Sequence, residues 1–172
     1  MRKPITVISS SVAAAAIVAL GIAVAGLAST SSPSGGAQST SETTTEGPKT
    51  TKHRAALTVG AEVPKPKGVR AGVSGGFKLD LIDSSGSYSI AWTLTFRNLT
   101  GRAQAAHIHK GRPGKAGPVV VGLCGPCSSG RKGKAKVSKS VAASIKAGTA
   151  YVNVHTARNA AGEIRGQVKT AS

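Results

Sequence analysis

Two histidines separated by one residue, His107 and His109, are the residues whose type and spacing most favour metal chemistry. Side chains of an extended strand alternate between its two faces, so both imidazoles point the same way. A later segment, residues 151–156, places Asn153 and His155 on one face and two valines on the other. If these two strands pair side by side, the three imidazoles form a set of neutral nitrogen ligands suited to copper or zinc.

The same histidines are also consistent with a structural role. In that interpretation they donate to backbone carbonyls, or to Thr156 and Glu163, and fix the ends of two ordinary strands. A third interpretation is redox catalysis, because the H-x-H spacing on a strand resembles that of copper–zinc superoxide dismutases. That analogy has only three histidines, since His53 falls in a predicted linker and Glu163 is the only nearby carboxylate.

Glu163 and Arg165 are predicted to share the outer face of a strand, with Ile164 turned inward. An exposed ion pair across strands, or a contact with His155, is the simplest role for them. Asn153, Thr156, Glu163 and Arg165 are therefore expected to support the histidines. No serine, histidine and carboxylate fall in a hydrolase-like arrangement, so we expect no catalytic residue.

Cys124 and Cys127 enclose Gly-Pro, the same four residues as in thioredoxin active sites. Thioredoxins place the first cysteine at a helix N-terminus, whereas residues 128–130 here are Ser-Ser-Gly. Two cysteines in an exported chain usually form a disulfide, so we expect a bridge that shapes the loop. Thiol–disulfide exchange, aided by Arg131 and Lys132, and metal binding together with the histidines stay open as alternatives.

Alternating apolar and polar residues predict the strands that position these groups. Residues 77–81 and 88–96 alternate with period two on either side of a turn and predict an antiparallel hairpin. The apolar face of its second strand consists of Tyr88, Ile90, Trp92, Leu94 and Phe96. This hairpin is expected to supply the aromatic half of the core.

Shorter patterns predict further strands at residues 55–60, 104–109, 118–123, 149–155 and 163–169. The β-branched run at 118–123 is expected to be buried on both sides. A short helix is predicted over residues 138–146, with Ser138 as its N-cap. Together these elements favour an all-β fold, an antiparallel Greek-key-like β-sandwich or barrel with one short helix.

The first 54 residues have the composition of a leader and a linker. Residues 1–28 combine a basic start with an uncharged apolar run, which predicts a secretory signal peptide or, if uncleaved, an N-terminal membrane anchor. Residues 29–54 are rich in Ser, Thr and Gly and contain no large apolar residue, which predicts a disordered linker. The folded domain is expected at residues 55–172, secreted or held in the cell envelope.

The chain is strongly basic, with 23 Lys and Arg against 6 Asp and Glu. Such a charge attracts anionic polymers. The densest cluster, Arg131, Lys132, Lys134 and Lys136, is predicted to be a loop that is either simply solvated or in contact with an anionic polymer. No aromatic residue sits beside the basic runs as a stacking platform, so specific nucleic-acid binding is not expected.

Two long motifs carry a resemblance to a known family. They are AHIHKGRPGKAGPVVVGL at residues 106–123 and GTAYVNVHTARNAAGEIRGQVK at residues 148–169, preceded by LTVGAEVPKP at residues 57–66. This wording resembles the CHRD domain, a module first named from chordin and found in many secreted bacterial proteins. The resemblance implies an extracellular all-β module but no settled activity.

We therefore expect a non-catalytic binding module, outside the cell or at its envelope, whose ligand the sequence does not identify. A copper- or zinc-binding or superoxide-dismutase-like protein is one alternative, and a thiol–disulfide protein is another. Contact with a membrane is expected only through an uncleaved N-terminal segment.

Overall fold

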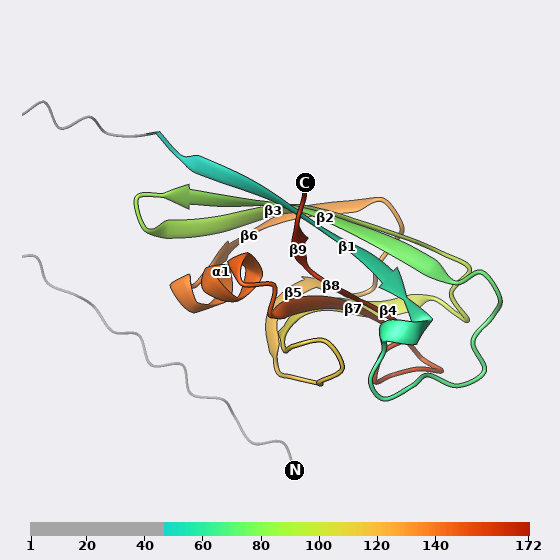
Figure 1. Ribbon diagram of the computed structural model, residues 1–172. Helices are drawn as coiled ribbons and strands as arrows, with labels where there is room; N and C mark the ends of the chain where they lie inside the picture. Colours follow the sequence, from blue (N-terminus) through green and yellow to red (C-terminus); the bar gives the residue numbers. More distant parts are fainter. Residues whose placement is uncertain (1–46) are drawn as a thin grey trace, which may run out of the picture. The chain divides into compact units, whose positions relative to one another are not determined.

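The computed structural model describes residues 47–172, so the predicted leader and most of the predicted linker lie outside the described residues. The described residues form strands and one short helix (Figure 1). In chain order these are β1 (Lys49–Thr58), the 3-10 turn η1 (Val59–Ala61), β2 (Ser74–Ser84), β3 (Ser87–Arg97), β4 (Ala103–Lys110), β5 (Val119–Cys124), β6 (Arg131–Val137), α1 (Lys139–Lys146), β7 (Ala150–Thr156), β8 (Ile164–Gln167) and β9 (Lys169–Thr170).

The strands form one antiparallel sheet in the order β5-β4-β7-β8-β1-β2-β3-β6, and β9 pairs with β1. The sheet curls until it is nearly closed into a barrel (Figure 1). The segment between β5 and β6 bridges the gap, since Cys127 N–H donates to the Ala103 carbonyl on β4 and Gly130 N–H donates to the Leu94 carbonyl on β3. The predicted antiparallel all-β fold with one short helix is confirmed.

The predicted hairpin forms the longest ladder of the sheet. β2 and β3 pair without interruption from Ser74 opposite Arg97 to Ser84 opposite Ser87. Their inward residues meet the aliphatic residues of β1, β4, β7 and β8 in a single core. Its fully buried large members include Leu57, Phe77, Leu79, Leu81, Ile90, Leu94, Ile108 and Ile164. Burial of this apolar surface, at roughly 25 cal/mol per Å², holds the barrel together.

The predicted helix is also present. The Ser138 hydroxyl accepts from Val141 N–H, as an N-cap should, and Ile145 is completely buried against the core. Gly148 follows with a φ of 66°, a left-handed conformation that glycine adopts without strain. Among residues 47–172, none of the helical segments has the length and hydropathy that crossing a bilayer requires.

The first strand begins earlier than expected. β1 starts at Lys49, within the segment predicted as linker, and pairs with β2 from its first residue. His53 was predicted to lie in that linker and instead lies in β1 with 3% of its surface exposed. The polar residues 49–54 pair because β2 extends far enough to offer them a partner strand, which local composition does not reveal.

Two further predictions are wrong, and both concern an edge strand of the sheet. β5 was expected to be buried on both sides, but it is an edge strand, and Val119 is 52% exposed. The basic cluster was expected to be a loop, but it forms the opposite edge strand, β6, which pairs with β3. The inward residues of β6 include Gly133, and the Trp92 indole occupies the place that a side chain at this position would take. Because Trp92 of β3 fills the space beneath Gly133, β6 needs few large apolar residues, and its sequence therefore lacks the alternation of large apolar with polar residues that would predict a strand.

Candidate metal centre

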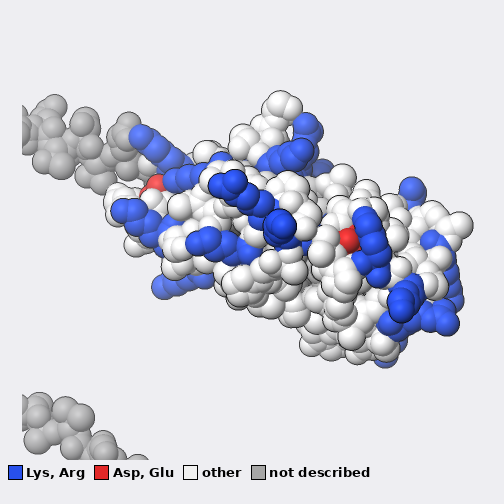
Figure 2. All heavy atoms as spheres, turned by 60° about the horizontal axis from the view of Figure 1, so that its bottom comes forward, with Lys and Arg blue, Asp and Glu red and all other residues white. Residues whose placement is uncertain are grey.

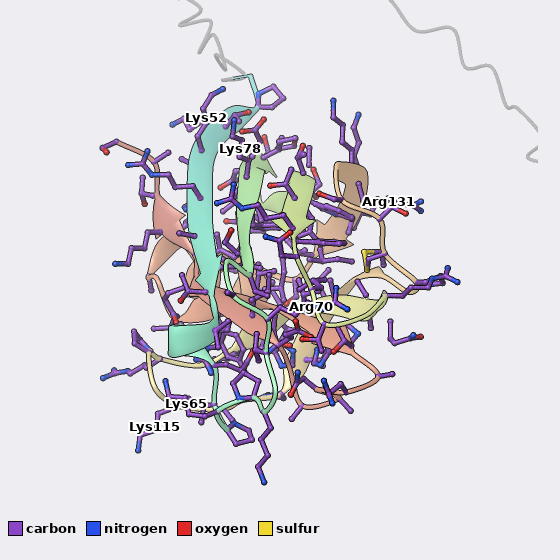
Figure 3. All side chains as sticks on the ribbon, turned by 90° about the vertical axis from the view of Figure 1, so that its right-hand side faces the viewer. Lys52, Lys65, Arg70, Lys78, Lys115 and Arg131 are labelled. Carbon is purple, nitrogen blue, oxygen red and sulfur yellow. A yellow bond between two sulfur atoms is a disulfide. The ribbon has the colours of Figure 1, made fainter. Side chains whose placement is uncertain are left out.

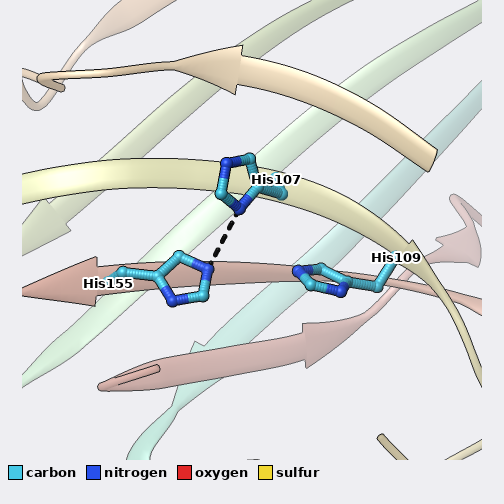
Figure 4. Close-up of side chains that lie close together, drawn as sticks. All are labelled: His107, His109 and His155. Atoms are coloured by element: carbon cyan, nitrogen blue, oxygen red, sulfur yellow. Dashed lines mark hydrogen bonds between the residues drawn. The ribbon is translucent and has the colours of Figure 1, made fainter. Parts of the chain in front are cut away.

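Three histidines converge on the face of β4 and β7 that is turned away from the core. His109 and Tyr151 are opposite each other in the two strands, and so are His107 and Asn153, while His155 is opposite Ala105. One nitrogen from each imidazole lies within 4.8 Å of the others (Figure 4). The two valines between these β7 residues, Val152 and Val154, are completely buried on the other face. The period-two alternation predicted from the sequence is therefore present.

Backbone carbonyls orient two of the three rings. His109 Nδ1 donates to the Gly117 carbonyl and His155 Nδ1 donates to the Ala160 carbonyl, both at 2.9 Å. A carbonyl oxygen only accepts, so each Nδ1 carries the proton and each Nε2 keeps its lone pair. Outer hydrogen bonds of this kind commonly orient metal-ligating histidines. The structural and metal-binding interpretations of the histidines are thus compatible.

The unprotonated nitrogens of His109 and His155 differ in their partners. His109 Nε2 is buried and has no hydrogen-bond partner among residues 47–172. His155 Nε2 lies 3.1 Å from His107 Nδ1 and accepts its proton, as the dashed line in Figure 4 marks. A cation that binds between the rings would replace this hydrogen bond and give His109 Nε2 a partner.

Burial keeps these imidazoles neutral. His109 is 8% exposed, and the other two rings are partly buried. Loss of solvent lowers the pKa of all three, and the neighbouring imidazoles lower the pKa of His107 further. The hydrogen bonds to Gly117 and Ala160 oppose this in His109 and His155 without reversing it. Neutral imidazole is the form that binds a metal ion.

Arg165 holds the loop that covers His109. Its Nη2 donates to the carbonyls of Arg112, at 3.1 Å, and Lys115, at 2.9 Å, in the loop of residues 111–118 between β4 and β5. The guanidinium carbon lies 3.4 Å from the centre of the Tyr151 ring, which stacks on the His109 ring at 4.8 Å. Arg165 was expected to be exposed, but the loop leaves only 1% of it accessible. It supports the site through this loop.

Glu163 does not serve the histidines. It was predicted to share an exposed face with Arg165, yet it is completely buried just before β8. Its carboxylate accepts from Thr100 N–H at 2.6 Å, from the hydroxyls of Thr100 and Thr156, and from Asn159. Burial alone would raise the pKa of Glu163, but these hydrogen bonds lower it. Glu163 and Thr156 therefore fasten the β3–β4 connection to the end of β7.

A buried carboxylate that the sequence reading missed, Glu62, lies behind Asn153. Asn153 Nδ2 donates to both carboxylate oxygens at 2.8 Å, and Glu62 has no exposed surface. Burial raises the pKa of Glu62 to about 7, against the lowering effects of the Val63 N–H, the Arg165 charge and Asn153. The only signal in the sequence was a single acid between Ala61 and Val63 in the family-like opening string. Glu62 thus holds Asn153, the residue opposite His107.

The two cysteines form the predicted disulfide. Cys124 and Cys127 are joined, and both pack against the core as partly buried residues. Their sulfurs are bonded to each other and are not members of the histidine cluster. The segment that follows is a turn leading to β6, whereas a thioredoxin-like cysteine would be followed by a helix.

Comparison with known proteins supports the resemblance seen in the motifs. The CHRD domain matches residues 53–168, which is about two thirds of the chain. No curated protein and no solved structure matches the chain. The matched region includes the three clustered histidines, both cysteines and Glu62. The chain therefore belongs to the CHRD domain family.

Proposed function

We propose that this CHRD module is an extracellular, non-catalytic binding protein that holds a copper or zinc ion through His107, His109 and His155. The observation that supports this most is the convergence of the three rings, each with one nitrogen within 4.8 Å of the others. Two of the rings are fixed by carbonyls, and His109 Nε2 is buried without a hydrogen-bond partner in the part of the chain that the structure describes.

The ligand set favours borderline metals over hard ones. Imidazole nitrogen binds copper and zinc well, whereas calcium and magnesium prefer oxygen ligands. Divalent copper binds a given nitrogen site more tightly than zinc, so we expect the site to bind copper preferentially when both ions are available. Three protein ligands leave a further position for water or a small ligand.

An extracellular location is supported by the family and by composition. CHRD domains are typically extracellular, and residues 1–28 have the pattern of a signal peptide or anchor. Retention of the metal-loaded protein in the cytoplasm after fractionation would contradict this part of the proposal.

The test is a titration of metal-free protein with Cu²⁺ and with Zn²⁺ by calorimetry. His109→Ala and His155→Ala should each weaken binding by at least about 100-fold, because a first ligand matters at least as much as its outer partners. His53→Ala is the matched control, since this histidine is buried in β1 and is not a member of the cluster. It should leave the affinity unchanged.

The proton dependence gives a second readout. Because the pKa of each clustered histidine is lowered, fewer protons compete with the metal at pH 6 than for ordinary imidazoles. Copper affinity should therefore fall less between pH 7.5 and 6 than it would at a site of three solvent-exposed imidazoles. The proposal fails if the wild-type protein binds neither ion, or if the alanine variants bind as well as it does.

A further inference from the structure

A second, independent feature lies on the outside of the barrel wall formed by β1, β2, β3 and β6. There the described residues form a groove of about 680 Å³. Its charged lining residues are Lys52, Arg54, Lys78, Asp80, Lys132 and Lys134. Five of these six are cations, and they come from three strands that are far apart in the sequence.

Sheet register explains how these cations gather. One row across the four strands runs from Lys52 to Asp80, Ala91 and Lys134, and the next runs from Arg54 to Lys78, Thr93 and Lys132. Residues in register share a face of the sheet, so both rows point outward. The alternate residues of β1 to β3, among them Leu79 and Trp92, face the core.

The rows give the groove a floor and two walls. Ala91 and Thr93 on β3 are short and form the floor. Lys52, Arg54 and Lys78 stand on one side, and Lys132 and Lys134 stand on the other, on the edge strand β6. Neighbouring strands lie about 4.8 Å apart, so β2 and β6 are roughly 10 Å apart across β3. Figure 3 shows Lys52 and Lys78 on adjacent strands, at the end of the molecule opposite Lys65 and Lys115.

Little negative charge offsets these cations. Residues 47–172 contain 21 Lys and Arg but only four acids, and Glu62 and Glu163 are completely buried. Figure 2 shows one face of the molecule, on which blue far exceeds red. Of the two acids with exposed surface, Asp80 lies in the groove and Asp83 pairs with Lys146.

We propose that this groove binds inorganic polyphosphate, as a linear chain lying along β3 between the two walls. Four of the five cations are lysines, whose compact ammonium groups bind phosphate as point charges, and Arg54 adds a planar guanidinium that also matches phosphate oxygens. The rows are only about 7 Å apart along the strands, so a densely charged chain matches them best.

Other polyanions fit the groove less well. The aromatic residue that lines it, Trp92, is 6% exposed and packed under Gly133, so it offers no platform for bases or sugar rings. A flat lipid surface would touch the rims of a groove rather than its floor. The proposal is independent of the metal centre, whose histidines lie on β4 and β7.

The experiment measures binding of metal-free protein, in chelator, to inorganic polyphosphate of one narrow chain length. Lys132→Glu with Lys134→Glu should weaken binding at least tenfold, and so should Lys52→Glu with Lys78→Glu on the other wall. Arg70→Glu with Arg102→Glu makes the same change in net charge at exposed sites outside the groove and should have less than a threefold effect. Circular dichroism establishes that each variant is folded.

Three outcomes would overturn the proposal. Equal losses in all three double variants would mean that total charge, and not the groove, binds the polymer. Unchanged binding in every groove variant that is folded would exclude the groove as the binding site. Tighter binding to anionic vesicles, to heparin or to single-stranded homopolymer DNA than to polyphosphate, with the same dependence on the groove lysines, would assign the groove to that ligand instead.

Discussion

The proposed metal centre and the basic groove use polar residues in opposite ways. In the proposed metal centre the polar groups are buried or partly buried, and several are oriented by a carbonyl, a ring or a carboxylate from elsewhere in the chain. In the basic groove the cations are exposed on the outer face of the sheet, and strand register brings them together. A buried group requires a partner because an unpaired one is costly, whereas an exposed lysine requires none. The first region can be selective for one small ligand, and the second acts through its summed charge.

The largest difference should appear when a buried carboxylate and an exposed one are neutralised in turn. Glu163→Gln should destabilise the protein by roughly 3 kcal/mol. The amide NH₂ of glutamine cannot accept the hydrogen bonds that a carboxylate oxygen now accepts from Thr100 or Thr156. Asp80→Asn should change the free energy of unfolding by less than about 0.5 kcal/mol. Urea unfolding measures both. Similar values for the two variants would remove the contrast.

Glu62 sharpens the comparison through pH. Its pKa is raised from 4.5 to about 7 in the folded protein, so folding takes up a proton between these values. The resulting stability is present below about pH 4.5 and is lost as the pH rises to about 7, by roughly 3 kcal/mol in total.

Glu62→Gln should remove this part of the pH dependence. The measurement is urea unfolding of both proteins at pH 5 and pH 8. An identical pH dependence in the variant and the wild type would mean that Glu62 titrates normally.

Salt should separate the two sites. Five cations that neutralise phosphates, at a slope of about −0.7 each, predict roughly 100-fold weaker polyphosphate binding between 50 and 200 mM salt. Copper binding by neutral imidazoles should change less than threefold over the same range. Parallel titrations at several salt concentrations provide the slopes, and a copper affinity as salt-sensitive as that of polyphosphate would contradict this division.

Removal of the disulfide should affect stability but neither site. Replacement of Cys124 and Cys127 by serine opens a loop of four residues, which is expected to cost about 2 kcal/mol. Thermal unfolding with and without reductant measures this effect in the wild type. Copper affinity should stay the same, and a loss of it would show that the bridge positions the histidines.

The smallest expected effect tests the outer support of the metal centre. Arg165→Lys keeps the charge but loses the planar group that reaches two loop carbonyls, so copper affinity should fall by about tenfold. The electron paramagnetic resonance spectrum of the copper form should shift as His109 loses its fixed orientation. Arg158→Lys, at an exposed arginine, is the control and should leave the spectrum unchanged.

The sequence was sufficient for the features that depend on local alternation. Period two placed His107 and His109 on one face, and the hairpin of β2 and β3 followed from the clearest alternating run. Alternation says which face a residue occupies but not what covers that face. Arg165 was therefore assigned correctly to the outside of its strand and wrongly to solvent, because the loop of residues 111–118 folds over it.

Features that depend on distant partners could not be predicted. Glu62 meets Asn153 across 91 positions, and neither residue signals the other locally. The sequence predicts a loop at β6 because Gly133, which faces the core, has no side chain, and Trp92 of β3 fills the space instead. The basic groove was missed for the same reason, since only the register of four strands brings Lys52 and Lys78 beside the lysines of β6.

The ligands of the proposed metal centre come from two strands, and His107 and His155 are 48 positions apart in the sequence. In an unfolded chain only His107 and His109 are held close together, because they are two residues apart. His155 joins them only when β4 and β7 pair in the folded protein. A chain that is translocated unfolded would therefore carry no tightly held ion across the membrane. It would load its metal on whichever side it folds, and a chelator added there should lower its melting temperature.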